Sequence, residues 1–377
     1  MTPDPPSGES SATATAALPD IDRSIHRNRV RAVLGDGLDA IVVSSGPSIR
    51  WLTGFTGSAG TVVLIGDALV LVTDGRYREQ AQDEVDVDAV SVVVSRELRD
   101  PMRELLASAA TVGLESDDVS WAFQRALSDQ WLPGADVVPV EPSLRTLRSV
   151  KQEGETARIR RAAAITDGAL AEILAGGLVG RSEAELAWDI EGHMRAGGAD
   201  RAGYDLIVAS GPNGARPHHT AGPRRVEKGD LVVIDIGAEV DGYRSDMTRT
   251  YVMGRPTDRQ RLLLETVARA QDGGVGAARA GSLGSDVDEA CRAVLAAEDL
   301  DDAFVHGVGH GVGPEIHEPP MLGRRSDALL EPDVVITVEP GVYVPGEGGV
   351  RVEDTVLITV DQAERLTLAP KEPVRGR

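Results

Sequence analysis

The chain changes its pattern of expected secondary structure near residue 150. Up to residue 142, short runs rich in β-branched residues alternate with helical stretches, which is typical of a small α/β domain. Beyond residue 153, two long helical runs, the second opening on a Ser182–Glu185 capping box, precede hairpins that alternate with helices. A chain of 377 residues exceeds one compact core, so we expect two domains. The expected parts are a disordered tail over 1–20, an α/β domain over 21–147, a hinge at 147–153 and an α+β domain over 148–377.

The composition excludes several classes of protein. A net charge of −21 argues against nucleic acid as a partner, because its phosphate backbone is also negative. No apolar stretch approaches the roughly 18 residues of a membrane span, and the first twenty residues lack the basic and apolar segments of a signal peptide. The single cysteine, Cys291, excludes a disulfide framework and is expected to be buried in a helix. We therefore expect a cytoplasmic protein with no membrane partner.

A tight hairpin is predicted around Asp241 and Gly242, a residue pair that favours such turns. With this pair at the turn, position 240 pairs with position 243, and Asp246 lies opposite Gly237. Because side chains alternate along a strand, Asp235 shares the face of Gly237, and the two aspartates become diagonal neighbours roughly 7–8 Å apart. Carboxylates at that separation can converge on cations. The alternative is that they hydrogen-bond to backbone or face solvent at a sheet edge.

Three of the seven histidines lie in the segment HGVGHGVGPEIHE, as His306, His310 and His317. The alternating glycines argue against a stable helix and allow the backbone to pass close to a bound group. Neutral imidazole is a common ligand of transition metals. A lone histidine is more often structural, but three in so short a glycine-rich segment indicate a metal or substrate site.

Two glutamates occupy strand-like positions in VVITVEPGVYVPGEGGVRVEDTVLIT. Glu339 is expected to end the first strand and Glu353 to lie inside the second. A glutamate among apolar residues needs a partner, and a salt bridge from Arg351 to Glu353 is the structural alternative to a metal.

Together these segments provide four carboxylates and one histidine, a donor set suited to Mn²⁺, Co²⁺, Fe²⁺ or Zn²⁺. Four carboxylates carry too much charge for one divalent ion and suit two, which can activate a water and polarise a carbonyl. The chain has no Walker-type phosphate loop and no Gly-Xaa-Ser-Xaa-Gly segment, so nucleotide binding and serine hydrolase chemistry have little support.

Five motifs, in the right order, resemble those of the Xaa-Pro peptidases in the pita-bread metallopeptidase family. They are ASGPNGARPHH, DLVVIDIGAEVDGYRSDMTRT, HGVGHGVGPEIHE, TVEPG and GGVRVEDTVLIT. Two more segments, IRWLTGFTGSAG and TDGRYREQA, resemble the creatinase-type N-terminal domain, so the resemblance covers residues 24 to 368. It implies an α+β fold in which a pita-bread catalytic domain follows a smaller α/β creatinase-like domain.

The resemblance also implies roles for single residues. The five metal ligands would be Asp235, Asp246, His310, Glu339 and Glu353, of which Asp246 and Glu353 would bridge both ions. The catalytic residues would be His218, His317 and Glu339, and the substrate-binding residues would be His306 and Arg351. His219 is the alternative to His218. We prefer His218 because it directly follows the proline.

The implied activity is hydrolysis of the N-terminal Xaa-Pro bond of dipeptides or short peptides, using two divalent ions such as Mn²⁺, with Co²⁺ or Zn²⁺ possible. The implied assembly is a homodimer. Two alternatives within the peptidases stay open, namely a dipeptidase and an aminopeptidase that accepts longer peptides. An alternative from another class is a non-catalytic binding protein on the same fold. A creatinase-like activity is disfavoured because all five ligands are present, and a methionine aminopeptidase usually lacks the N-terminal domain.

Overall fold

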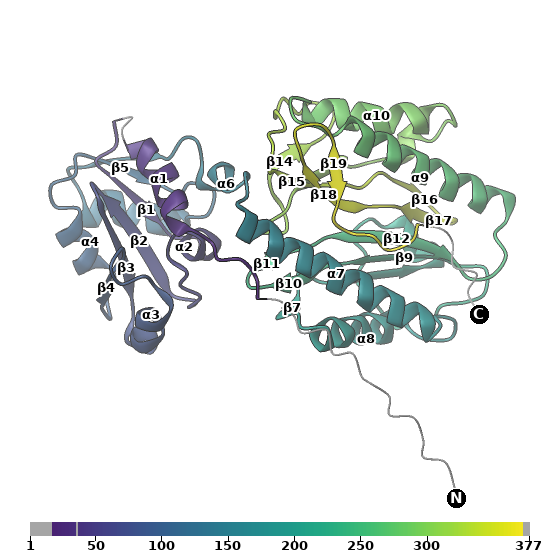
Figure 1. The fold of residues 1–377 in the computed structure, drawn as a ribbon, viewed down its shortest axis with the longest axis horizontal. Coiled ribbons are helices and arrows are strands. Elements are labelled where there is room, and N and C mark those ends of the chain that lie inside the picture. The colour runs from purple at the N-terminus through teal and green to yellow at the C-terminus, as the bar shows by residue number, and fades with distance from the viewer. Residues whose placement is uncertain (1–16, 35–36, 372–377) are drawn as a thin grey trace, which may run out of the picture.

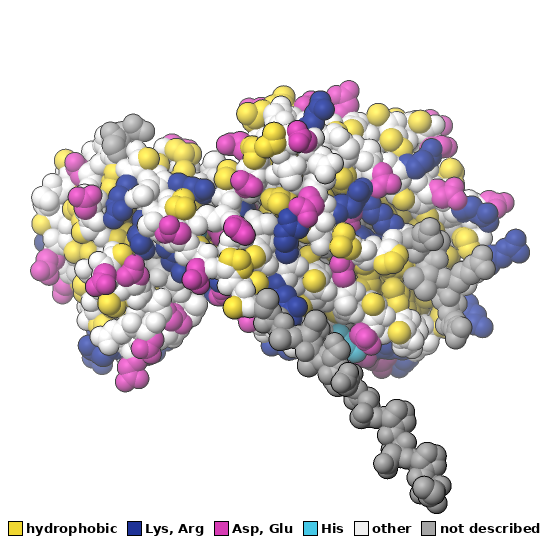
Figure 2. Space-filling model, in the orientation of Figure 1, with side chains coloured by type: hydrophobic (Ala, Val, Ile, Leu, Met, Phe, Trp, Pro, Cys, Tyr) yellow, Lys and Arg dark blue, Asp and Glu magenta, His cyan; other side chains and the backbone are white. Residues whose placement is uncertain are grey.

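The computed structural model describes residues 17–34 and 37–371, which form two lobes joined by a short connection (Figure 1). Most of the tail expected over residues 1–20 lies outside the described residues. Among the described residues, no helix is long and apolar enough to cross a membrane. Acidic and basic side chains are interspersed over both lobes on the face shown in Figure 2, and neither kind gathers into one patch.

The N-terminal lobe is a six-stranded mixed sheet with helices packed against it, in the order β4-β3-β2-β1-β5-β6. Its strands are β1 (Ala40–Val43), β2 (Gly60–Ile65), β3 (Ala68–Thr73), β4 (Ser91–Val94), β5 (Thr111–Leu114) and β6 (Asp136–Pro139). Its helices are α1 (Arg23–Leu34), α2 (Gly46–Thr53), α3 (Arg78–Glu84), α4 (Arg99–Leu105) and α5 (Trp121–Arg125). Ile41 and Val43 face one apolar core, and Ala40 and Val42 face a second. The sheet is therefore buried on both faces, which explains why its strands read as continuous apolar runs.

The second lobe consists of two helix pairs that enclose several small antiparallel sheets. The helices are α7 (Glu153–Ala175) with α8 (Glu183–Ala196), and α9 (Asp258–Ala277) with α10 (Gly284–Ala296). The strands beside α7 and α8 are β7 (Arg201–Ala202), β8 (Ile207–Ser210), β9 (Leu231–Ile236), β10 (Ala238–Val240), β11 (Tyr243–Arg244) and β12 (Met247–Val252). Those beside α9 and α10 are β13 (Gly309–Gly311), β14 (Glu318–Leu322), β15 (Val335–Val338), β16 (Gly341–Val344), β17 (Gly348–Arg351), β18 (Asp354–Ile358) and β19 (Ala363–Arg365).

Each helix pair covers its own apolar core, and the strands of the two halves meet between them (Figure 1). The predicted capping box opens α8, where the Ser182 hydroxyl accepts from the Glu185 N–H and the Glu185 carboxylate accepts from the Ser182 N–H. Cys291 is fully buried in α10, as expected, and a Cβ on Gly274 of α9 would collide with its sulfur. The helices therefore form the outer layers of this lobe, and the strands lie between them.

The segment 147–153, expected to be a hinge, is instead packed into the structure. Val150 pairs with Val334 in an isolated bridge, while Arg148 and Lys151 are only 0% and 3% exposed. Both cations form ion pairs with the second lobe, because burying them unpaired would be costly. The hinge interpretation is therefore wrong, and the segment is a fixed connection.

Candidate metal centre

Strands from both halves of the second lobe bring the five expected ligands together. Asp235 lies in β9, and the pairing of Ile236 with Met247 and of Val240 with Tyr243 keeps the predicted register. His310 lies in β13, and Glu339 follows the last residue of β15. The remaining two ligands, Asp246 and Glu353, come directly before β12 and β18.

The position predicted for Glu353 needs a correction. It precedes β18 rather than lying inside a strand, because the Gly- and Pro-rich connection itself forms a hairpin, β16–β17. The Glu353 N–H donates to the Thr248 carbonyl at 3.0 Å, and the Thr248 hydroxyl donates to Glu353 Oε2 at 2.6 Å. The carboxylate is therefore fixed in place by the neighbouring strand β12.

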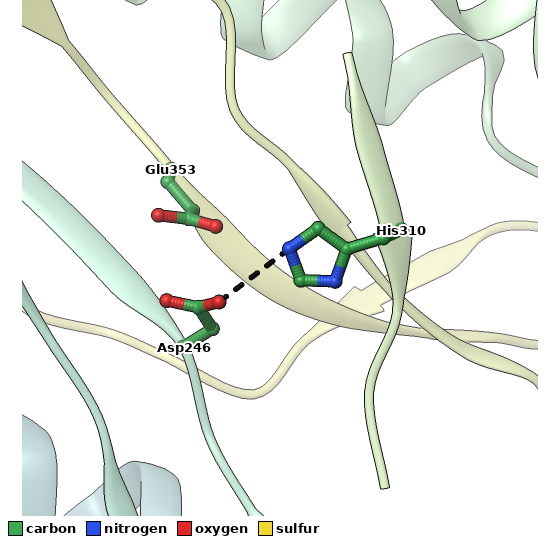
Figure 3. Close-up of side chains that lie close together, drawn as sticks. All are labelled: Asp246, His310 and Glu353. Atoms are coloured by element: carbon green, nitrogen blue, oxygen red, sulfur yellow. Dashed lines mark ion pairs between the residues drawn. The ribbon is translucent and has the colours of Figure 1, made fainter. Parts of the chain in front are cut away.

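Asp246, His310 and Glu353 form a compact cluster in which one ligand atom from each lies within 4.8 Å of the others. Figure 3 shows their two carboxylates and the imidazole facing a common centre. His310 Nε2 is 3.6 Å from Asp246 Oδ2 and 3.5 Å from Glu339 Oε1. The Tyr204 hydroxyl is 2.6 Å from Asp235 Oδ1 and 2.5 Å from Asp246 Oδ1, so it joins the two aspartates predicted to be neighbours.

The directions in which the pKa values of this cluster are shifted fit a site for a divalent cation. Burial raises the pKa of Asp246 and Glu353 well above the ordinary range, and neighbouring carboxylates raise it further. Burial likewise raises the pKa of Glu339. Buried acids in this state gain free energy when a cation lies among them. Burial also lowers the pKa of His310, and its Nδ1 lies 3.1 Å from the Gly311 carbonyl, so a neutral imidazole directs Nε2 at the acids.

Arg351 pairs with Asp235, not with Glu353 as the structural alternative required. Its guanidinium also donates to the Tyr343 hydroxyl at 2.8 Å and to the Thr248 hydroxyl at 3.0 Å. Asp235 is 8% exposed, which excludes the solvent-facing alternative for that residue. Sequence reasoning did not find Tyr204 and Tyr343, because each reaches the site by a contact that no local pattern reveals.

The expected histidines line the same cavity of about 860 Å³ as the five ligands. His218 is exposed in this cavity, whereas His219 Nε2 lies 2.8 Å from the carboxylate of buried Glu183. His306 Nε2 is 2.9 Å from the Tyr343 hydroxyl. The His317 ring packs edge-on against His310, with centroids 4.4 Å apart. His218 is therefore the more exposed of the two adjacent histidines, and His219 is the one held by an acid.

The cavity is lined by apolar as well as charged side chains. Leu206, Ile207, Ala221 and Ile316 are among the apolar ones. Two larger lining residues are exposed, Trp188 of α8 at 72% and Met321 of β14 at 57%. A lining of both kinds suits a small ligand that has charged and apolar parts.

Comparison with known proteins identifies this architecture. Residues 157–360 match the model of metallopeptidase family M24, and residues 27–150 match that of the creatinase/prolidase N-terminal domain. The chain belongs to metallopeptidase family M24. The predicted two-domain α+β class, with a pita-bread domain after a creatinase-like domain, is confirmed. Members of this metallopeptidase family use divalent metals, which the buried Asp246–His310–Glu353 cluster fits.

Named relatives of this M24 chain are peptidases. It is 34% identical over 338 residues to a Xaa-Pro dipeptidase from Pyrococcus horikoshii, covering 89% of this chain and 95% of the relative. The structure of a Xaa-Pro dipeptidase from Bacillus anthracis superposes with a TM-score of 0.89 at 35% identity, covering 94% of this chain and 99% of the other. The structure of an X-Pro aminopeptidase from Thermotoga maritima gives 0.83 at 32% identity, covering 92% and 99%. The comparisons give no support to a non-catalytic binding protein.

Proposed function

We propose that this chain is a metal-dependent exopeptidase that hydrolyses the bond between an N-terminal residue and a following proline. The observation that carries this proposal is the convergence of acids and histidines on one cavity. The chain is also similar over nearly its whole length to proteins named Xaa-Pro dipeptidase and X-Pro aminopeptidase.

Two divalent ions would be held by the five residues that the resemblance assigns, with Asp246 and Glu353 shared between the ions. When bound, such ions polarise a carbonyl and lower the pKa of a water. The Tyr204 hydroxyl donates to Asp235 Oδ1 and to Asp246 Oδ1, and Arg351 pairs with the other oxygen of Asp235. The chain's own hydrogen bonds thus fix the donor atoms before any ion arrives, which reduces the cost of assembling the site.

The remaining polar groups would handle the substrate. Burial lowers the pKa of His317, and neighbouring His310 lowers it further, so a neutral ring can donate one N–H to the developing oxyanion. His218, which lines the same cavity, would be a second donor. Glu339, whose pKa burial raises, would carry a proton to the leaving proline nitrogen. His306 and Arg351, joined through the Tyr343 hydroxyl, would orient the substrate.

Proline at the second position suits this cavity for two reasons. The scissile amide of an Xaa-Pro peptide is tertiary, so it brings no N–H that requires an acceptor. The apolar side chains of the lining provide contacts for the pyrrolidine ring. Selection by shape would then favour proline over an open-chain residue.

A panel of peptides with and without metals tests this function. Leu-Pro, Leu-Pro-Gly and Leu-Ala are incubated with metal-free protein and with protein loaded with Mn²⁺, Co²⁺ or Zn²⁺. We expect metal-dependent cleavage of the proline peptides at a kcat/KM about 100-fold above that of Leu-Ala. The ratio between Leu-Pro and Leu-Pro-Gly separates a dipeptidase from an aminopeptidase. Folded, metal-loaded protein that cleaves none of them, or all equally, would overturn the proposal.

Further proposals concern the setting of the enzyme. We propose Mn²⁺ as the working metal, a homodimer as the assembly and the cytoplasm as the compartment. The donor set of carboxylates and one imidazole supports Mn²⁺, and a single buried cysteine is compatible with a reducing compartment. We place the domain boundary between residues 147 and 148, inside the packed connection.

A further inference from the structure

The connection between the lobes presents three cations to the loop that carries His317. It comprises α6 (Leu144–Leu147) and residues 148–151, and α6 lies between the two lobes in Figure 1. Its cations are Arg145, Arg148 and Lys151. The loop, residues 313–318, offers them two acids on either side of His317, namely Glu315 and Glu318.

The contacts between connection and loop are close and largely buried. Glu315 Oε2 accepts from Arg148 and, at 3.0 Å, from Arg145 Nε. Lys151 Nζ lies 2.5 Å from Glu318 Oε1, and both side chains are fully buried. Arg145 also donates to the backbone carbonyl of His317 itself. The backbone of His317 is therefore held from both sides and at its own carbonyl.

Arg148 also reaches into the N-terminal lobe. Its second terminal nitrogen donates to the Ser48 hydroxyl in α2, which in turn donates to Glu115 Oε1 at 2.5 Å. Glu115 follows β5, and its other oxygen accepts from the Ser45 N–H at 3.0 Å. One guanidinium, fully buried, thus joins an acid of the N-terminal lobe to an acid of the His317 loop.

This network restricts the arrangement of its atoms more than it stabilises the fold. A buried ion pair contributes little compared with apolar residues of the same volume, because both charges must be desolvated. Its hydrogen bonds do, however, restrict the atoms they join to one arrangement, since any shift leaves a buried charge without its partner. A Cβ on Gly313 would collide with the Glu318 carboxylate, so the loop backbone is also closely fitted to the network.

We infer that Arg148 is a positioning residue through which the N-terminal lobe sets the location of His317 in the cavity. Movement of α2 would pull on the guanidinium through Ser48, and the guanidinium would transmit it to Glu315, two residues from His317. The inference rests on the proposed function only for its kinetic consequence. The mechanical part, which links α2 to the loop, is independent of any activity.

The experiment compares Ser48→Ala, Arg148→Ala and Arg148→Lys with Arg160→Gln, all in the full chain. Arg160 forms a half-exposed ion pair with Glu364 on the surface and serves as the matched control. The first readout is hydrogen–deuterium exchange of residues 313–318. We expect exchange to accelerate about fivefold to tenfold in Ser48→Ala, the cost of one lost buried hydrogen bond, and to stay at the wild-type rate in Arg160→Gln.

The second readout is kinetic, on metal-loaded protein with Leu-Pro. In Ser48→Ala we expect kcat to fall about tenfold and KM to change less than about twofold. A misplaced His317 would weaken binding of the transition state but not of the substrate. Arg148→Lys should recover less than half of the loss seen in Arg148→Ala, since an ammonium cannot reach both partners at once. Should Arg148→Ala fail to fold, Ser48→Ala decides alone, because it removes a single hydroxyl.

Unchanged exchange of residues 313–318 in Ser48→Ala would overturn the inference, as would equal kinetic losses in Ser48→Ala and Arg160→Gln. These results differ from a failure of the proposed function. Wild-type protein that cleaves no Xaa-Pro peptide would sink the proposed function, while faster exchange in the loop of Ser48→Ala would still support the mechanical link.

Discussion

Glu353 and Asp354 are consecutive and both buried, but their pKa values are shifted in opposite directions. Glu353 faces the cavity among other acids, and burial with their repulsion raises its pKa well above the ordinary range. Asp354 faces the protein, where it pairs with Arg249 at 2.7 Å and with Arg365 and Lys371 at 3.0 and 3.1 Å. Burial would raise the pKa of Asp354 too, but these cations outweigh it and the pKa lies below the ordinary value.

The difference between the two acids shows what distinguishes a candidate cation site from a structural ion network. Around Asp354 the protein's own cations complete the charge balance. Around Glu353, Arg351 is engaged with Asp235, Arg249 reaches the Glu353 backbone carbonyl and pairs with Asp354, and the neighbouring carboxylates raise the pKa of Glu353. Two buried carboxylates can look alike in sequence, and only their long-range partners separate them.

The largest expected effect is on activity. Glu353→Gln should lower kcat/KM for an Xaa-Pro peptide by more than about 1,000-fold, as expected when one member of a cooperating unit is removed. Asp354→Asn should retain activity wherever it is folded, because its side chain points away from the cavity. The assay is run at matched folded concentration, and comparable losses in the two variants would break the comparison.

The second effect is on stability and runs the other way. Asp354→Asn should lower the free energy of unfolding by about 3–5 kcal/mol, because it leaves buried Arg249 without its anionic partner. Glu353→Gln should be neutral or stabilising in metal-free protein, since it removes repulsion between buried acids. Urea denaturation with a chelator present measures both, and an Asp354→Asn variant as stable as wild type would contradict the account.

His218 and His219 are a second adjacent pair whose members have different partners. We expect a smaller loss of activity from their substitution than from that of Glu353. His218→Ala should keep its metals and lose about 100-fold in kcat, the usual consequence of removing one oxyanion donor. His219→Ala should lose about tenfold, the lower end of the range for a residue that acts by holding another in place, because this ring is held by Glu183. Loss of metal from His218→Ala would show that it is a ligand, and a larger loss for His219→Ala would reverse the choice.

How far such distinctions follow from sequence depends on the range of the contacts. The pairing around Asp241 is local, so the register that places Asp235 and Asp246 together was predicted and confirmed. The strand position of Glu353 was wrong because β16 and β17 pair with each other inside a segment that looked like a plain connection. The partner of Arg351 is Asp235, far away in the chain, and no spacing rule reveals such a contact. The prediction of a hinge around Arg148 fails for the same reason, because the partners of Arg148 and Lys151 are distant in the chain.

The smallest effect is a pH dependence. Folding raises the pKa of the neighbouring acids Asp246 and Glu353. In metal-free protein, the free energy of unfolding therefore falls as pH rises above the ordinary carboxyl range. The stability advantage of Glu353→Gln over wild type should therefore grow with pH, by at most about 1.4 kcal/mol per pH unit up to the raised pKa. Denaturation at about pH 5 and about pH 7 measures it. A difference that is constant with pH, or that shrinks, would contradict the assigned direction.

We propose that five residues within or directly beside separate strands hold two ions, with Asp246 shared and Asp235 serving one. The most direct test is the metal content per chain after dialysis from a modest metal excess, with folding checked by circular dichroism. We predict about two ions for wild type, about one for Asp235→Ala and close to none for Asp246→Ala, since losing a shared ligand weakens both positions. Two ions retained by both variants would contradict the claim.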